Sequence, residues 1–338
     1  MAGDDEGGLE NHFASISNGL AEKNCDIIVI GHPKYASRMS DQIRYYPLDL
    51  TLHRRHLPTL FRIIKILKNE RPDIIHAQAN KATAILVNTF RLSVLIGNRL
   101  AGKKIATIHS VKKNTKVFQH TDALIGVSKG VVANINHSNC EVIHNGVAIW
   151  DGDRLNKSAL ANRFNLDQQK PISLAIGRLV PVKSYDNLIK AWRQPFGSLI
   201  IAGEGPEHEK LNTLIQATGL QEHIVLAGNC NDIRSMLPAA DLMVFSSKRE
   251  GFSYALIEAL LAELPVLSTR VPGAEEILPQ ECLVATDDID GLSRLLEMNL
   301  IDLPLLRARC APVFKWASDT LTDERMIDHT YNFYLKQL

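Results

Sequence analysis

The stretch LMVFSSKREGFSYALIEALLA, residues Leu242–Ala262, joins an apolar run to a helical pattern through a glycine turn. The run LMVF predicts a buried strand, and the residues from Tyr254 onward predict a helix with Ser253 as its N-cap. A helix that starts directly after a strand directs its free backbone N–H groups and its positive dipole end at one point. We therefore expect the turn at Gly251 to suit a phosphate group.

Two glutamates flank this predicted turn. Glu250 stands just before it, and Glu258 lies on the second turn of the predicted helix. Such carboxylates could reach the hydroxyls of a bound sugar and of a ribose. A capped amphipathic helix with a surface acid at each end has the same spacing, so the spacing alone does not decide. The order strand, glycine turn, helix favours a ligand site.

Apolar runs of strand length recur along the whole chain, and helix-length segments separate them. The runs are continuous rather than alternating, which is typical of parallel strands buried on both faces. The chain is therefore predicted to be a parallel α/β protein. The predicted strands are Asp26–Gly31, Gln42–Tyr46, Asp73–His76, Lys104–His109, Ala123–Val127 and Glu141–His144, and then Ile172–Ile176, Ser198–Ala202, Ile224–Ala227, Leu242–Phe245, Val266–Ser268 and Cys282–Val284.

A polar segment, Trp150–Lys170, separates the two series of strands. We place the domain boundary there, with one α/β domain over residues 1–150 and a second over residues 165–314. The length of 338 residues agrees with two or three domains of about 100–200 residues each. The last segment, Lys315–Leu338, is predicted to be one long helix.

The composition is that of an ordinary globular protein, with 45% hydrophobic and 22% charged residues. It excludes collagen, a disordered tail, a disulfide miniprotein and a coiled-coil rod. The five cysteines form no C-x-x-C motif and indicate reduced thiols. No apolar run reaches the ~18 residues of a membrane span, and the first ten residues are unlike a signal peptide. We expect a cytoplasmic protein that can sit on a membrane surface.

The charge is unevenly distributed. Residues 1–140 hold 19 Lys and Arg against 11 Asp and Glu, whereas the remainder is net negative. The first half should therefore attract anions. Leu57–Asn69 predicts a helix with an apolar stripe at positions 57, 60, 61, 64 and 67 and with basic residues off the stripe. Packing on the first sheet and contact with a membrane surface are both compatible with that pattern.

Three further motifs stand at the start of a helix or the end of a predicted strand. Gly177-Arg178 and Lys183 follow one strand, and two cations on one loop can hold a diphosphate. Gly203 and Gly205 follow the next strand, where they would let a ring or a phosphate approach the backbone. Gly7-Gly8 opens a helix near the N-terminus. Each of the three motifs is also compatible with an ordinary surface turn.

Together these motifs resemble the retaining nucleotide-sugar glycosyltransferases of family 4, and bacterial lipopolysaccharide and capsule transferases in particular. VIHNGV (Val142–Val147) and VPGAEEIL (Val271–Leu278) extend the resemblance over nearly the whole chain. It implies the GT-B fold, in which two Rossmann-like, doubly wound parallel sheets face a central cleft. It also implies that the helix over 315–338 crosses back to the first, acceptor-binding domain, and that the second domain binds the nucleotide sugar.

The resemblance assigns roles to individual residues. Arg178 and Lys183 would neutralise the leaving diphosphate, Glu250 would hold the hydroxyls of the donor sugar, and Glu258 would bind the ribose. His109 would lie beside the donor sugar, although a lone histidine at a strand end is more often structural, as we interpret His76. The remaining donor-binding positions are Gly7, Gly8, Gly203, Gly205, Gly251, Phe252 and Ser253.

The implied reaction retains the anomeric configuration and needs no metal ion or other cofactor. We expect a nucleotide-sugar donor, with UDP favoured, and a lipid-linked or phosphorylated glycan as acceptor. An anionic membrane surface is an expected partner, whereas nucleic acid is not, because no recognition motif is present. A nucleotide-sugar epimerase and a non-catalytic nucleotide-sugar-binding subunit remain alternatives.

One departure from the family concerns the N-terminus. The family's first domain opens with a strand before the Gly pair, and only Met1–Glu6 precedes Gly7 here. None of these residues has the pattern of a strand. We expect this first strand to be missing from the sequence and the true start to lie upstream.

Overall fold

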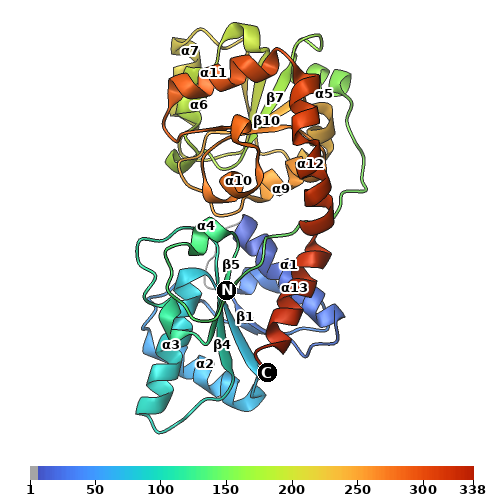
Figure 1. The fold of residues 1–338 in the computed structure, drawn as a ribbon. Coiled ribbons are helices and arrows are strands. Elements are labelled where there is room, and N and C mark those ends of the chain that lie inside the picture. The colour runs from blue at the N-terminus through green and yellow to red at the C-terminus, as the bar shows by residue number, and fades with distance from the viewer. Residues whose placement is uncertain (1–6) are drawn as a thin grey trace. The chain divides into compact units, whose positions relative to one another are not determined.

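The computed structural model describes residues 7–338. Met1–Glu6, on which the expectation of a missing strand rests, lie outside the described residues. The chain divides into two compact units. The first consists of Met1–Gly146 with Asp323–Leu338, and the second of Val147–Thr322. Figure 1 shows that each unit is built from strands with helices packed around them.

The first unit contains two parallel sheets in the part of the chain that the structure describes. One pairs β1 with β2, and the other has the order β3-β4-β5-β6. The strands span β1 Ile28–Gly31, β2 Arg44–Pro47, β3 Ile74–Gln78, β4 Lys103–Ile108, β5 Ala123–Gly126 and β6 Cys140–Val142.

Helices cover these sheets through three apolar cores, of which one joins α1 to β1. Ile16 and Leu20 of α1 pack with Met326 and Phe333 of α13 against strand residues such as Ile105. A second core joins α2 and α3 (Figure 1). The helices of this unit are α1 Gly8–Glu22, α2 Leu57–Glu70, α3 Ala79–Leu95, α4 Lys129–Val132 and α13 Asp323–Leu335.

Helix α2 forms as predicted, and its buried stripe agrees with the predicted one at positions 60, 64 and 67. Ile63 and Ile64 are buried, whereas Leu57 is 55% and Phe61 47% exposed. The predicted stripe is therefore wrong at positions 57 and 61. The helix rests on the core through the face that contains Leu60 and Ile63, so the face that contains Phe61 is left toward solvent.

The second unit contains one six-stranded parallel sheet within residues 147–322, all of which the structure describes. Its order is β12-β11-β10-β7-β8-β9, so that β10, β7 and β8 lie side by side near its centre. The strands span β7 Ile172–Ile176, β8 Ser198–Ala202, β9 Ile224–Gly228, β10 Leu242–Phe245, β11 Val266–Thr269 and β12 Leu283–Val284.

Helices separate these strands along the chain and also precede the first and follow the last of them, as expected for βαβ units. They span α5 Lys157–Arg163, α6 Tyr185–Ala191, α7 His208–Ala217, α8 Ile233–Met236, α9 Tyr254–Leu261, α10 Pro272–Ile277, α11 Ile289–Leu300 and α12 Leu303–Thr320. Each of the twelve runs singled out in the sequence overlaps one of the observed strands, and every strand pairing in the described residues is parallel. The predicted parallel α/β fold is confirmed.

The single helix expected over Lys315–Leu338 is wrong. Helix α12 ends at Thr320, and α13 begins at Asp323. The backbone of Val147 donates to the Leu321 carbonyl at 3.0 Å, and Val147 forms a parallel bridge with Thr322. In a continuous helix the Leu321 carbonyl would accept from an amide four residues later, so its bond to Val147 interrupts the helix.

Candidate active site

The candidate site of the second unit lies at the carboxyl edge of β10, β7 and β8. Because these parallel strands are neighbours, the loops that follow them meet at one edge of the sheet. The loop after β7 leads through the short helical turn Pro181–Lys183, and the loop after β10 leads into α9. These loops contain most of the predicted donor-binding residues.

Lys183 and Glu250 form the central contact of this edge. Lys183 Nζ lies 2.6 Å from Glu250 Oε1, and both side chains are largely buried, at 18% and 17% exposed. Ser247 Oγ donates to the same carboxylate oxygen at 2.9 Å. An ion pair this enclosed fixes both charged groups in place, because solvent screens it less than a surface pair.

Hydrogen bonds to main-chain carbonyl groups join the same two loops. Ser246 Oγ donates to the Lys183 carbonyl at 2.9 Å, and the Lys248 amide donates to the Val182 carbonyl at 2.8 Å. The cation and the carboxylate are therefore held by their backbones as well as by their own contact. Arg178, the other predicted cation, is exposed on the loop after β7.

Glycines allow the loops after β7 and β8 to touch. A Cβ atom on Gly203 would lie 2.1 Å from the Gly177 carbonyl oxygen, and one on Gly205 would lie 2.4 Å from the Leu179 carbonyl oxygen. Both glycines have positive φ values, +143° and +159°. Gly177 in turn leaves space for Lys183, whose Nζ would be 3.1 Å from a Cβ there. Close backbone approach therefore explains these glycines.

The turn before α9 is arranged as the sequence predicts. Helix α9 begins at Tyr254, with Ser253 in the N-cap position, although the Ser253 side chain makes no capping hydrogen bond. Phe252 is buried. Gly273 of α10 packs against the turn, where its Cβ would lie 2.7 Å from the Gly251 carbonyl oxygen. The segment VPGAEEIL thus supports the Gly251 turn.

Glu258 has a partner that the sequence did not reveal. Arg234 Nε of helix α8 lies 3.0 Å from Glu258 Oε1. Burial raises the pKa of the Glu258 carboxyl above its ordinary value, and the Arg234 charge and hydrogen bond oppose that shift. The pair is separated by 24 positions in the chain, and no sequence motif links the two residues.

In the first unit, His109 lies directly after β4 within a cluster of aromatic rings and amides. Its Nε2 is 2.9 Å from Gln78 Oε1, at the end of the neighbouring strand β3. The ring of His12, from α1, meets the His109 ring edge-on with centroids 4.6 Å apart. Burial lowers the pKa of His109 well below its ordinary value and that of His12 to about 4. Both rings are therefore neutral at pH 7.

His76 is bonded through both ring nitrogens. Nδ1 lies 2.5 Å from the Tyr334 hydroxyl, and Nε2 lies 2.7 Å from Thr107 Oγ1. Burial lowers the pKa of His76 to about 3. These contacts agree with its interpretation as a structural residue that ties β3 to β4 and α13.

Gly7 and Gly8 open helix α1, with Gly7 in the N-cap position. His12 follows about one turn into the same helix, so α1 links the Gly pair to His109 within the first unit. The structure thus assembles two sets of predicted site residues. Lys183, Glu250 and the loop glycines belong to the second unit, and Gly7, Gly8 and His109 belong to the first.

Two family descriptions match the chain. Residues 6–149 match the glycosyltransferase family 4, and residues 156–311 match the glycosyl transferases group 1. Together they span nearly all of the sequence. The chain belongs to these glycosyltransferases.

Curated relatives agree with this assignment. The lipopolysaccharide core biosynthesis glycosyltransferase LpsE of Rhizobium meliloti is 26% identical over 317 residues, covering 90% of this chain and 89% of LpsE. The GPI3 subunit of the phosphatidylinositol N-acetylglucosaminyltransferase of Saccharomyces cerevisiae is 26% identical over 334 residues, covering 90% of this chain and 73% of that subunit.

Solved structures share the fold of this glycosyltransferase. The crystal structure of Anabaena HepE in complex with UDP and glucose has a TM-score of 0.81 at 17% identity and covers 100% of this chain and 98% of HepE. The fold is therefore the predicted GT-B fold. Across residues 7–338, no helix combines the length and the apolar character that crossing a membrane requires.

Three residues that contact the predicted site residues of this glycosyltransferase were not identified from its sequence. Gln78 stands at a strand end two positions after His76, so the strand-end argument used for His109 could have included it. His12 lies one helical turn after the Gly pair, which is a weaker signal. Arg234 has no such signal, because only the packing of α8 brings it to Glu258.

Proposed function

We propose that this glycosyltransferase moves a sugar, with retention of anomeric configuration, from a UDP-sugar to a lipid-linked or phosphorylated glycan in cell-surface polysaccharide or lipopolysaccharide biosynthesis. The observation that carries the proposal is the enclosed Lys183–Glu250 pair at the carboxyl edge of the second sheet. HepE, which shares the fold, binds UDP and glucose, and the relative LpsE acts in lipopolysaccharide core biosynthesis.

In this proposal the second unit binds the donor. Lys183 and Arg178 neutralise the diphosphate, the Gly251 turn and α9 meet its oxygens, and Glu250 holds the sugar hydroxyls. The glycines at 203 and 205 leave the backbone open to the nucleotide, and Glu258 receives the ribose. In the first unit, His109 is the residue for the donor sugar. Its neutral ring can accept or donate one hydrogen bond per nitrogen.

The reaction breaks the bond between the anomeric carbon and the diphosphate oxygen, and the leaving group departs with the electron pair. The acceptor hydroxyl forms the new bond on the same face of the sugar. Its proton passes to the departing phosphate oxygen. Positive charge develops on the sugar and negative charge on the diphosphate, and fixed cations stabilise the latter. Lys183 and Arg178 provide these cations, so the proposal includes no metal ion.

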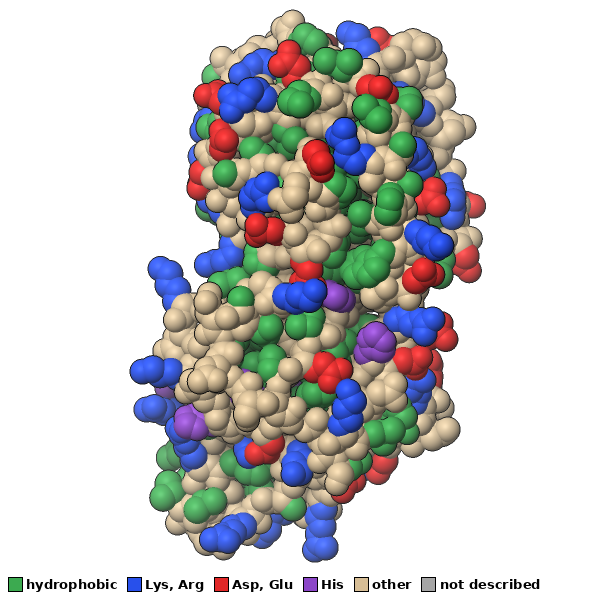
Figure 2. Space-filling view, viewed as in Figure 1, with side chains coloured by type: hydrophobic (Ala, Val, Ile, Leu, Met, Phe, Trp, Pro, Cys, Tyr) green, Lys and Arg blue, Asp and Glu red, His purple; other side chains and the backbone are tan. Residues whose placement is uncertain are grey.

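The proposed acceptor domain has a surface that suits an anionic membrane. Leu57 and Phe61 are exposed on α2, where Arg62 and Lys65 are exposed beside them. Figure 2 shows Lys and Arg side chains along the edge of this unit where α2 and α3 lie. A groove of about 560 Å³ adjoins α3 and is lined by Val87, Phe90, Arg91, Val94, Leu95, Lys104 and His120. We propose that this face rests on the inner surface of the cytoplasmic membrane.

Thermal unfolding across a panel of UDP-, GDP-, ADP- and CMP-sugars tests the donor site. All three tryptophans, Trp150, Trp192 and Trp316, belong to the second unit, so their fluorescence reports its unfolding. We expect UDP-sugars to stabilise this unit by about 2.7 kcal/mol at 100 times the dissociation constant. The effect should disappear in Arg178→Ala and in Glu258→Ala.

The outcome of the panel separates the alternatives. Stabilisation by a different nucleotide alone would replace UDP in the proposal, and no stabilisation by any of them would contradict a nucleotide-sugar site. A nucleotide-sugar epimerase would alter the donor sugar without an acceptor, whereas a transferase releases the nucleotide faster when acceptor is added. Binding without either reaction would indicate a non-catalytic subunit.

Sedimentation with lipid vesicles tests the membrane surface. We expect binding to phosphatidylglycerol vesicles and little binding to phosphatidylcholine, since each Lys or Arg near an anionic surface contributes about 1 kcal/mol. The double variant Leu57→Ser/Phe61→Ser should bind several-fold more weakly. Ile301→Ser is the matched control, because Ile301 is 82% exposed but lies in the second unit. Equal loss in the control and the double variant would contradict the proposed face.

A further inference from the structure

Arg234 makes three contacts from the short helix α8. Its Nε meets Glu258 Oε1 at 3.0 Å, and its Nη1 donates to the Ala148 carbonyl at 3.3 Å. Its guanidinium carbon lies 5.9 Å from the centre of the Trp150 ring. A planar guanidinium that is held at both of these nitrogens and against an aromatic ring has little freedom to reorient.

The backbone around Arg234 is also fixed. Asp232 pairs with Arg163 at 2.5 Å, and the Ser235 amide donates to the Asp232 carbonyl at 2.9 Å. The Leu155 amide donates to the Ser235 carbonyl at 2.9 Å. The position from which Arg234 extends is therefore set by contacts on both sides of it in the chain.

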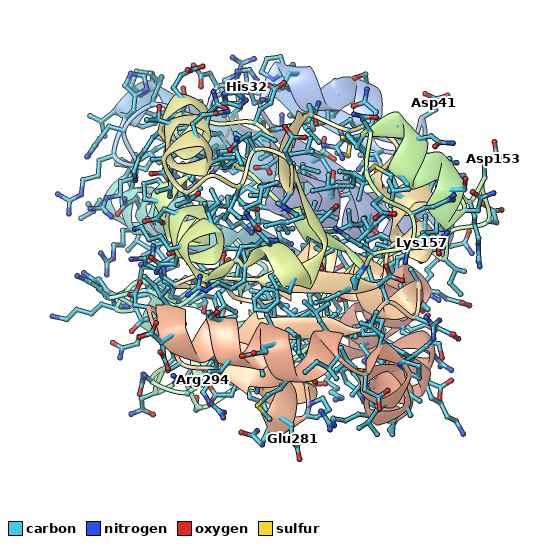
Figure 3. The ribbon with its side chains drawn as sticks, turned by 90° about the horizontal axis from the view of Figure 1, so that it is seen from above. His32, Asp41, Asp153, Lys157, Glu281 and Arg294 are labelled. Carbon is cyan, nitrogen blue, oxygen red and sulfur yellow. The ribbon has the colours of Figure 1, made fainter. Side chains whose placement is uncertain are left out.

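Trp150 is held in place by the residues that follow it in the chain. A Cβ on Gly152 would lie 2.5 Å from Trp150 Cζ2, and Trp150 Nε1 donates to the Asp153 carbonyl at 3.2 Å. Figure 3 labels Asp153 near the edge of the view, on the segment that leads from Trp150 into α5, and Lys157, where α5 begins. The turn at residues 150–153 thus fixes the Trp150 ring against which the Arg234 guanidinium packs.

We propose that Arg234 is a positioning residue that orients the Glu258 carboxylate toward the ribose of the donor and thereby sets selectivity for ribonucleotides. The inference rests on the proposed ribose-binding role of Glu258. A carboxylate offers about four lone-pair sites on two oxygens. The contact with Arg234 Nε occupies one of them on Oε1, and the rest can accept both vicinal hydroxyls of a ribose.

The positive charge of Arg234, like its position, favours ribose binding by Glu258. Glu258 is buried enough that its pKa is raised, and a protonated carboxyl would offer fewer acceptor sites. Arg234 favours the ionised form, whose remaining lone-pair sites all accept hydrogen bonds from hydroxyl groups. Hydrogen bonds to an ionised group contribute about 1.5–3 kcal/mol each, which corresponds to roughly 10–100-fold in affinity.

The experiment compares the binding of UDP and of 2′,3′-dideoxy-UDP to the full chain by calorimetry. We expect the wild type to bind UDP at least about 10-fold more tightly than the dideoxy compound. Arg234→Gln and Glu258→Gln should each lose most of this ratio while keeping their affinity for the dideoxy compound. The double variant should lose no more than either single variant, because the two residues act as one unit.

Two further variants control for folding and for charge. Arg307→Gln removes an exposed arginine ion pair elsewhere in the same unit, the one with Glu263, and should keep the full ratio. Arg234→Lys keeps the charge but lacks the planar fork, so it should show an intermediate ratio. Tryptophan fluorescence of each variant checks that the second unit remains folded.

The outcomes are distinct. An equal loss of affinity for both ligands in Arg234→Gln would overturn the inference, because the residue would then act on the nucleotide directly or on the fold. Loss of the ratio in Glu258→Gln but not in Arg234→Gln would overturn the inference and leave the ribose role of Glu258 intact. A wild type without any preference for UDP would overturn both.

Discussion

Glu250→Gln is expected to lower the rate of sugar transfer by about 10²–10³-fold while leaving UDP binding nearly unchanged. Glutamine has the same shape and can still accept a hydrogen bond from Ser247 Oγ, which lies 2.9 Å from the carboxylate. Glutamine lacks the negative charge of Glu250, which stabilises the positive charge that develops on the sugar. It also leaves the Lys183 ammonium, 2.6 Å away, without its ionic partner. Release of UDP from the donor in the presence of acceptor measures the rate.

The matched control for this variant is Asp287→Asn. Asp287 forms an ion pair at 2.7 Å with Lys248, a neighbour of Glu250 in the same loop, and both side chains are exposed by about half. Exposed pairs contribute little, so this control should retain wild-type activity within about twofold. A Glu250→Gln enzyme with wild-type kcat would contradict the proposed role of Glu250. Loss of UDP binding in parallel with kcat would instead assign Glu250 to ground-state binding.

Gly203→Ala is expected to destabilise the second unit by about 3 kcal/mol or more. Its Cβ would lie 2.1 Å from the Gly177 carbonyl oxygen, a backbone atom that cannot rotate away. The φ value of +143° adds a conformational penalty for any residue other than glycine. The loops after β7 and β8 would have to separate, and the lysine loop would shift with them. Urea unfolding followed by tryptophan fluorescence measures the effect on this unit alone.

Gly219→Ala provides the comparison. Gly219 also has a positive φ, +68°, but no atom lies within 4 Å of its would-be Cβ. It should therefore cost only about 1–2 kcal/mol, the conformational term by itself. The difference between the two variants isolates the steric contact between Gly203 and Gly177. Equal unfolding midpoints for the two would mean that the loops can separate without loss, and the close approach would not explain Gly203.

Much of the fold was predictable because its signals are local. A strand buried on both faces must be apolar along its length, so strands such as β7, β8 and β10 are continuous apolar runs in the sequence. The turn before α9 was predictable for the same reason, since strand, Gly251, Ser253 and helix follow one another directly. The proximity of Lys183 and Glu250 could also have been predicted. Both residues follow parallel strands, whose carboxyl ends share one edge.

Other features were predicted less well because they depend on what a segment packs against. The stripe of α2 was expected to include Leu57 and Phe61, which the structure leaves exposed. Periodicity identifies an apolar face but not which edge of that face meets the sheet. The helix expected over 315–338 is interrupted because Thr322 pairs with Val147, a residue remote in the chain.

The sequence by itself determined the parallel α/β fold, the glycine turns and the pair of glutamates around α9. These features depend on residues that lie close together in the chain, so their spacing can be read directly from the sequence. Only the tertiary structure decided that β10 lies beside β7, that Arg234 holds Glu258, and that His12 and Gln78 enclose His109. Such contacts join separate elements, and the relative placement of those elements produces no periodic pattern in the sequence. They are fixed by the packing of whole strands and helices, which no local pattern encodes.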